Sequence, residues 1–129
     1  MPETEKITIN MGAVDLGKID LLVQEGSYTN RTDFIRTAIR NQIDKHIFEI
    51  EQSVSRNSFV VGALIFDRKD LEKYRLKSEK INLKIIGFLH LQNDIDPELA
   101  KEVIESLQVR GIFQASEEVK KAIADKMRP

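Results

Sequence analysis

The chain has 129 residues and contains no cysteine. This absence excludes disulfide bonds and thiolate metal sites together. Long apolar runs are also missing, since none approaches the roughly 18–20 residues that a helix needs to span a bilayer. The first residues, Met-Pro-Glu-Thr-Glu-Lys, are polar and acidic, which is not typical of a signal peptide. We therefore expect a soluble cytoplasmic protein that does not insert into a membrane.

Histidine is scarce as well, with His46 and His90 the only two. A zinc-type site needs three or four ligands at workable spacing, so we predict no metal site. Ser, His and Asp do not converge in a catalytic spacing, and no Gly-Lys-Ser/Thr phosphate loop is present. The sequence therefore predicts no enzyme activity and no cofactor. His90 alternates with apolar residues, which favours an outward position on a strand.

An excess of basic charge is the third thing the chain lacks, because its formal net charge is −1. Residues 1–57 hold seven Lys/Arg and nine Asp/Glu. Proteins that bind DNA usually carry a basic footprint, since phosphate neutralisation drives much of their affinity. Any such footprint here must be local, with the acidic residues on other faces.

Residues 5–11 alternate strictly between polar and apolar side chains, which predicts a β-strand with two different faces. The apolar face consists of Ile7, Ile9 and Met11, and the polar face of Lys6, Thr8 and Asn10. The apolar face needs a core. The polar face carries hydrogen-bonding groups that could reach base edges in a DNA major groove, which admits a two-stranded ribbon.

Two amphipathic helices are expected after this strand. The first runs from about Val14 to Glu25 and ends at Gly26, a left-handed cap. The second opens at Thr29 or Asn30, where Asn30 and Asp33 form a capping pair. Its apolar stripe continues far enough to predict a helix as far as residue 51, followed by a serine-rich linker over residues 53–58.

One strand and two helices cannot form an independent domain. An unpaired strand leaves its backbone groups without partners, and about 50 residues bury too little surface alone. The economical solution is a homodimer in which the strands of two copies pair antiparallel and four helices cover the apolar side. This arrangement places the polar residues of both strands on one exposed ribbon.

The segment Lys6-Ile-Thr-Ile-Asn-Met, the first helix and the motif Gly26-Ser-Tyr-Thr-Asn-Arg-Thr-Asp-Phe-Ile-Arg together resemble the CopG-like branch of the ribbon-helix-helix transcriptional regulators. The likeness covers about residues 5–47. It implies that Lys6, Thr8 and Asn10 read DNA bases. It also implies that Thr29, Asn30 and Arg31 anchor a phosphate, where free helix amides meet an anion. The alternative is that neither group binds DNA. The polar strand face would then be an ordinary solvent-exposed face, and the start of the second helix would be a simple helix cap.

Residues 59–129 contain three similar segments, each with a glycine followed by a stretch of helical spacing. The glycines, Gly62, Gly87 and Gly111, are 25 and 24 residues apart. This pattern predicts a strand–helix unit used three times, as a stacked block or a small parallel sheet. Glycine in the middle of a strand indicates close packing of a helix or a neighbouring strand.

These patterns predict an α+β protein with a ribbon-helix-helix domain as an intertwined dimer over residues 1–52, a linker over 53–58 and a β/α repeat domain over 59–129. The leading hypothesis is a sequence-specific regulator that binds double-stranded DNA as a homodimer. A larger oligomer through residues 59–129 and a small-molecule effector are left open. The alternatives are a self-assembling scaffold that uses the N-terminal dimer as a clamp, and an antitoxin-type regulator that binds a partner protein.

Overall fold

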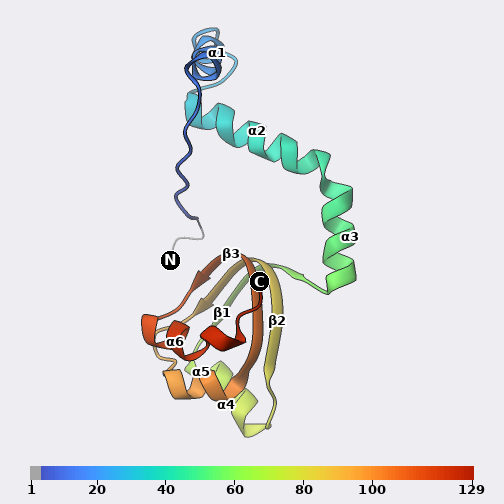
Figure 1. Cartoon of the computed structure of the whole chain (residues 1–129), viewed down its shortest axis with the longest axis vertical. Helices are drawn as coiled ribbons and strands as arrows, with labels where there is room; N and C mark the ends of the chain where they lie inside the picture. Colours follow the sequence, from blue (N-terminus) through green and yellow to red (C-terminus); the bar gives the residue numbers. More distant parts are fainter. Residues whose placement is uncertain (1–3) are drawn as a thin grey trace. The chain divides into compact units, whose positions relative to one another are not determined.

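The structure, a computed structural model, describes residues 4–129 and contains both helices and a parallel sheet (Figure 1). The described chain divides into two compact units, one of residues 6–53 and the other of residues 54–129 together with residues 4–5. Each unit is described below by itself. Within residues 4–129, none of the helices has the length and apolar character needed to cross a membrane.

The first unit begins with an extended segment, residues 6–12, followed by α1 (Ala13–Gln24) and α2 (Arg31–Lys45). The end of α1 confirms the expected glycine cap, because Gly26 has a φ of 84°. The backbone N–H groups of Gly26 and Ser27 donate to the carbonyls of Val23 and Leu22. These two bonds satisfy carbonyls that the end of a helix otherwise leaves open.

The second expected helix is two helices in the structure. α2 ends at Lys45, and α3 (Ile47–Asn57) begins after His46, whose φ of −105° and ψ of 13° lie outside the α-helical range. The prediction of one continuous helix to residue 51 was therefore wrong at His46. Apolar periodicity alone does not detect such a break, because the stripe of isoleucines continues on both sides of it.

The serine-rich stretch expected to be a linker, residues 53–58, is mostly helical. α3 runs to Asn57, and the chain leaves it at Ser58, which has a φ of 57°. The helix persists because Val54 continues the apolar period, and the N–H of Phe59 closes its end by donating to the Val54 carbonyl. The chain therefore has no irregular segment at 53–57. The functional domain boundaries remain a prediction.

The second unit contains three strand–helix pairs and a parallel three-stranded sheet in the order β1-β2-β3. Its elements are β1 (Val60–Phe66), α4 (Arg68–Leu76), β2 (Ile81–Leu91), α5 (Pro97–Val103), β3 (Ile104–Gln114), α6 (Glu117–Ala122) and the short 3₁₀ helix η1 (Ala124–Lys126). Figure 1 shows α4, α5 and α6 gathered beside the curved sheet. Of the two arrangements left open by the repeat, the structure has the parallel sheet.

Each helix of the repeat starts at a side chain that accepts from the first turn. Asp67 and Asp70 form a reciprocal capping box at α4. Asp96 accepts from the N–H of Leu99, with proline following it in the chain, and Ser116 accepts from the N–H of Val119. These caps fix where each strand turns back into a helix.

The core of this unit lies between the sheet and its helices. Alternate strand residues such as Ile85, Leu89 and Leu107 are buried against Leu71 of α4 and Leu99 of α5. By alternation, His90 belongs to the face of the sheet turned away from this core. It is nevertheless only 6% exposed and stacks on Phe88, with 6.0 Å between ring centroids. The expected outward face is therefore confirmed for His90, but its side chain is buried rather than exposed to solvent.

The three glycines of the repeat are in register across the sheet, Gly62 opposite Gly87 and Gly87 opposite Gly111. A Cβ added to Gly87 would lie 2.0 Å from the carbonyl oxygen of Gly62, and one added to Gly111 would lie 2.1 Å from that of Gly87. The prediction that glycine marks close packing of a neighbouring strand is confirmed. Side chains at both positions are excluded by backbone rather than by a movable neighbour.

We expect Gly87→Ala to lower the free energy of unfolding of this unit by about 3 kcal/mol or more, since it combines a φ of 139° with a backbone collision. Gly62→Ala is the matched control, because it has a similar φ of 144° but nothing within 4 Å. It should cost only the strain, about 1–3 kcal/mol. Denaturant unfolding of the full-length protein, followed by circular dichroism, measures both. Equal losses of unfolding free energy in the two variants would show that the carbonyl contact does not contribute to the effect.

Candidate nucleic-acid interface

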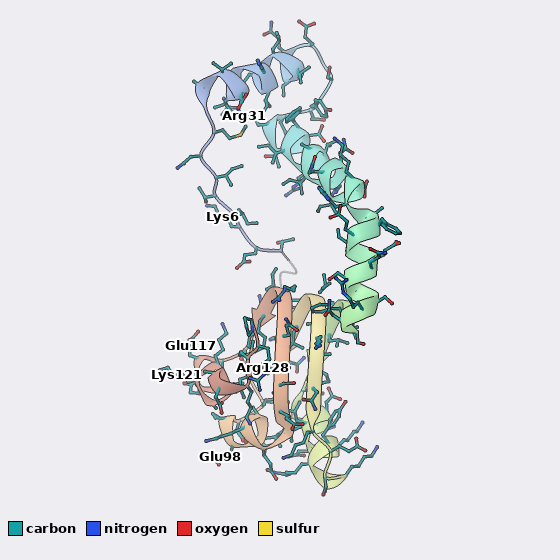
Figure 2. The ribbon with its side chains drawn as sticks, turned by 45° about the vertical axis from the view of Figure 1, so that its right-hand side comes forward. Lys6, Arg31, Glu98, Glu117, Lys121 and Arg128 are labelled. Carbon is teal, nitrogen blue, oxygen red and sulfur yellow. The ribbon has the colours of Figure 1, made fainter. Side chains whose placement is uncertain are left out.

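The extended segment exposes the side chains of both its faces. Lys6, Thr8 and Asn10 are in solvent, as expected for a polar face. On the apolar face, Ile7 is 79% exposed and Ile9 62% exposed. Within residues 4–129 this segment forms no ladder with any strand. Figure 2 shows Lys6 on this extended segment and Arg31 at the start of α2.

The helices of this unit also leave much of their apolar surface uncovered. Only Ile19 is buried among the residues of α1 and α2. The exposed large apolar side chains on α1, α2 and α3 are Val14, Leu21, Leu22, Ile39, Ile43, Ile47, Phe48 and Ile50. An exposed apolar area of this extent is typical of an interaction surface.

A hollow of about 290 Å³ lies between the end of the extended segment and the helices. Met11, Leu22 and Phe34 form part of its lining, together with the buried Ile19. Phe34 also contacts Tyr28 edge to face, with ring centroids 4.9 Å apart and an interplanar angle of 82°. The hollow therefore has an apolar wall. An incoming apolar side chain could fill the hollow.

The N-terminus of α2 is capped as the sequence predicts. The side-chain oxygen of Asn30 accepts from the N–H of Asp33 at 2.8 Å. The Asp33 carboxylate accepts in turn from the N–H of Thr29 at 2.9 Å. Among the described residues, no group accepts from the backbone N–H of Arg31 or of Thr32. Two amide donors at the positive end of a 15-residue helix are therefore free to meet an anion.

The side chain of Arg31 has a partner that sequence reasoning missed. Its Nε and one terminal nitrogen donate to the two carboxylate oxygens of Asp20 on α1, both at 2.8 Å. This bidentate geometry ties the start of α2 to α1. The pairing rules that apply within one helix, at spacings of three or four, give no signal for two residues 11 positions apart on different helices.

The ion pair shifts both groups in the direction that favours their charged forms. Hydrogen bonds from Arg31 hold the pKa of the Asp20 carboxyl below its ordinary value of 3.8, and those same bonds raise the pKa of Arg31. Because the pKa of Asp20 is lowered in the folded state, any stability from the pair is present above pH 4. It is lost as the pH falls through the lowered pKa. The pair is intact at neutral pH.

The structure thus forms one part of the expected site within a single chain and leaves the other part open. Thr29, Asn30 and Arg31 lie together at the first turn of α2. Lys6, Thr8 and Asn10 follow one another along an exposed segment whose strand geometry has no partner in the described part of the chain. No group of three or more His, Asp or Glu residues within 4–129 is arranged to hold a metal ion.

An extended segment of alternating character, followed by two helices joined by a capped turn, is the chain order of a ribbon-helix-helix protein. The model of the Ribbon-Helix-Helix transcriptional regulator family matches residues 2–120. The chain therefore belongs to this family, and the match includes most of the strand–helix repeat as well as the N-terminal segment. Neither the curated proteins nor the solved structures include a significant match to this chain.

Proposed function

We propose that this protein is a sequence-specific transcriptional regulator that reads the DNA major groove with a ribbon formed by two copies of residues 5–11. The observation that carries the proposal is the extended segment itself, whose apolar residues Ile7 and Ile9 are more than 60% exposed in the single chain. Pairing with a second copy would supply both the missing backbone partners and a cover for this face.

The polar face then supplies the base contacts. Lys6 has a cationic donor suited to the O6 and N7 acceptors of guanine. The Asn10 amide can donate and accept at adenine, and Thr8 can do either at a neighbouring base. Two-fold symmetry presents each of these residues twice, so the expected operator is a palindrome.

The start of α2 supplies the positioning contact. The free N–H groups of Arg31 and Thr32 and the side chains of Thr29 and Asn30 would meet a backbone phosphate. The charged side chains at this turn are one cation and two carboxylates, because Asp20 pairs with Arg31 and Asp33 caps the helix. The affinity of this site for phosphate is therefore limited, because the Asp20 carboxylate is already paired with the Arg31 side chain.

Asp20→Asn is expected to tighten DNA binding, about 3- to 10-fold at moderate salt, because it frees Arg31 and removes a negative charge near the phosphate. The plot of log affinity against log salt should become steeper by about 1 for each additional phosphate that the protein neutralises. Fluorescence anisotropy over a salt series measures both quantities. Glu25→Gln, which removes a carboxylate that forms no ion pair among the described residues, is the control. Weaker binding by Asp20→Asn would mean that the ion pair positions Arg31 instead of restraining it.

Selection of bound sequences from random double-stranded DNA, with the purified full-length protein, tests the proposal as a whole. Enrichment of a palindromic sequence is the expected result. Recovery of sequences without any common motif would contradict sequence-specific reading.

A further inference from the structure

The glycines at the centre of the sheet form a ladder with one position left vacant. Gly62, Gly87 and Gly111 share an unusual backbone conformation, with φ values of 144°, 139° and 128°. The space of a Cβ at Gly87 holds the carbonyl oxygen of Gly62, and the space at Gly111 holds that of Gly87. The corresponding space at Gly62 contains nothing within 4 Å. Gly62 thus has space for the carbonyl group of one more strand on the outer side of β1. The described part of the chain provides no such strand.

The other end of the sheet is complementary to this vacancy. By the repeated geometry, the carbonyl of Gly111 points outward from β3 as those of Gly62 and Gly87 point toward the next strand. The C-terminal residues cover this edge only near Leu107. There Met127 forms a β-bridge with Leu107, and the N–H of Arg128 donates to the Leu107 carbonyl. The part of β3 in register with β1 through β2, residues 109–114, carries no further strand among the described residues.

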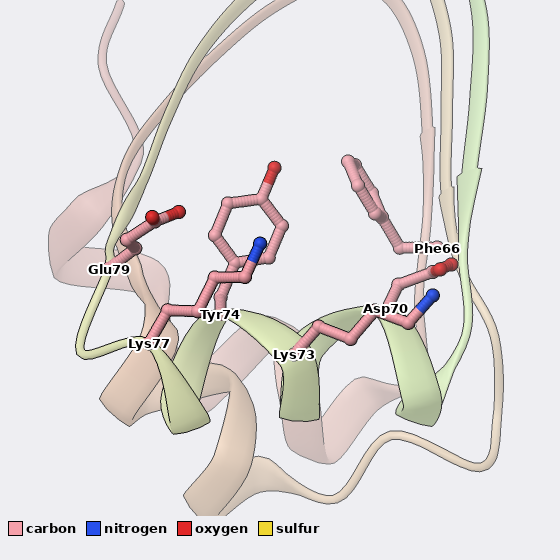
Figure 3. A pocket seen from close by; sticks show the side chains of 6 residues that line it. All are labelled: Phe66, Asp70, Lys73, Tyr74, Lys77 and Glu79. Carbon is pink, nitrogen blue, oxygen red and sulfur yellow. The ribbon is translucent and has the colours of Figure 1, made fainter.

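The first strand–helix unit also ends in an unfilled apolar surface. Val61 is 65% exposed and Ile65 is 51% exposed on β1. A cavity of about 290 Å³ lies between Phe66 at the end of β1 and α4. Tyr74 is its second aromatic wall, and its other lining residues, Asp70, Lys73, Lys77 and Glu79, are charged (Figure 3). In stacked repeats each unit covers the one before it, and terminal units normally carry a polar cap. Within residues 54–129, the charged residues of the first strand–helix unit lie on and next to α4, and β1 itself carries none.

The β1 edge also lacks the usual protection against pairing. Its sequence, Val-Val-Gly-Ala-Leu-Ile-Phe, contains no charged residue and no proline. Natural proteins commonly place such residues on an open edge to prevent association. An unprotected edge at one end and a matching open edge at the other favour association between copies of the same chain.

We propose that β1 of one copy pairs in parallel with β3 of a second copy, with Gly62 facing Gly111 of its neighbour. The sheet and the repeat then continue from one molecule into the next. The contact is heterologous, because it joins two different edges, so it leaves a free β1 and a free β3 at the ends of every open assembly. Such a contact produces chains of molecules unless the rotation between them closes a ring. It is separate from the proposed N-terminal ribbon and does not depend on DNA binding.

The glycine alignment fixes the register and provides the test. Val61 of one copy should face Arg110 of the next, since both are aligned with Ile86 in the single chain. Neighbouring strands lie about 4.8 Å apart, within the Cα separation that a disulfide bridges. The chain has no natural cysteine, so the full-length variant Val61→Cys with Arg110→Cys carries only the designed pair. Under mild oxidation, we expect a ladder of three or more linked chains on a non-reducing gel.

Three matched variants complete the experiment. Val61→Cys with Ile112→Cys moves one partner two residues along the strand, beyond the roughly 7 Å limit for a disulfide, and should give little product. Each single-cysteine variant should give none. A linked dimer from Val61→Cys alone would instead show antiparallel pairing of two β1 edges and would overturn the proposal. So would equal yields from the in-register and off-register pairs, or the absence of any product.

A second measurement does not depend on cysteine. The weight-average mass of the native chain should rise with concentration in light scattering, and Val61→Lys should reduce this rise by placing a charge at the β1 edge. Circular dichroism checks that the variant remains folded. The variant Lys6→Ala with Thr8→Ala should still assemble, so a failure of DNA reading and a failure of this contact are distinguishable. An unchanged rise in Val61→Lys would contradict the proposed edge.

Discussion

Lys6→Ala combined with Thr8→Ala is expected to weaken binding to the selected operator more than about 100-fold. One good bidentate base contact discriminates by roughly 1–3 kcal/mol, and the ribbon presents each residue twice. Neither side chain forms part of an apolar face, and both are exposed, so the fold of the dimer should not change. Gel-shift titration with operator and with scrambled DNA measures the effect, and sedimentation confirms the dimer.

Lys45→Ala is the control for this double variant, since it removes the same charge from the last turn of α2. It should reduce the affinity for operator and for scrambled DNA by similar small factors. The base-reading assignment fails if the double variant retains the native preference for operator over scrambled DNA.

Ile9→Asp is expected to abolish the N-terminal dimer and with it all DNA binding. In the proposed dimer, Ile9 of each copy is buried beneath the ribbon, so the variant would bury two unpaired carboxylates. Burial of an unpaired charge costs several kcal/mol, comparable with the whole stability of a small domain. Residues 54–129 have their own core and should stay folded. Circular dichroism should show a loss of helix content from the N-terminal unit, whereas the unfolding transition of residues 54–129 should remain.

Thr8→Asp is the matched control, because it introduces the same charge one residue away on the opposite face. It should leave the N-terminal dimer intact and prevent DNA binding through repulsion of phosphate. The two variants therefore separate assembly from recognition. If Ile9→Asp forms the dimer as readily as Thr8→Asp does, the apolar face of the segment is not buried between copies.

Local signals in the sequence predicted much of this fold. The cap at Gly26, the pair Asn30 and Asp33, and the helix starts at Pro97 and Ser116 are where short-range rules place them. The spacing of the glycines predicted a repeat because an exact register requires the same backbone geometry at the same point of each unit.

Features that depend on contacts between distant residues were not predicted. The Asp20–Arg31 pair joins two helices, and the alternation around His90 did not indicate that its side chain is buried. The break at His46 interrupts a helix without any change in the apolar pattern. For the candidate site, the polar and apolar faces of residues 5–11 can be assigned from alternation, whereas their pairing requires a second copy.

Amide hydrogen exchange of residues 5–11 in the full-length protein tests the central claim most directly. If two copies pair through this segment, ladder hydrogen bonds should slow exchange of its amides by more than about 100-fold, and Ile9→Asp should remove that protection. Exchange of these amides at the rate of an open chain, in a sample shown to be dimeric, would contradict the ribbon and the proposed mode of DNA recognition.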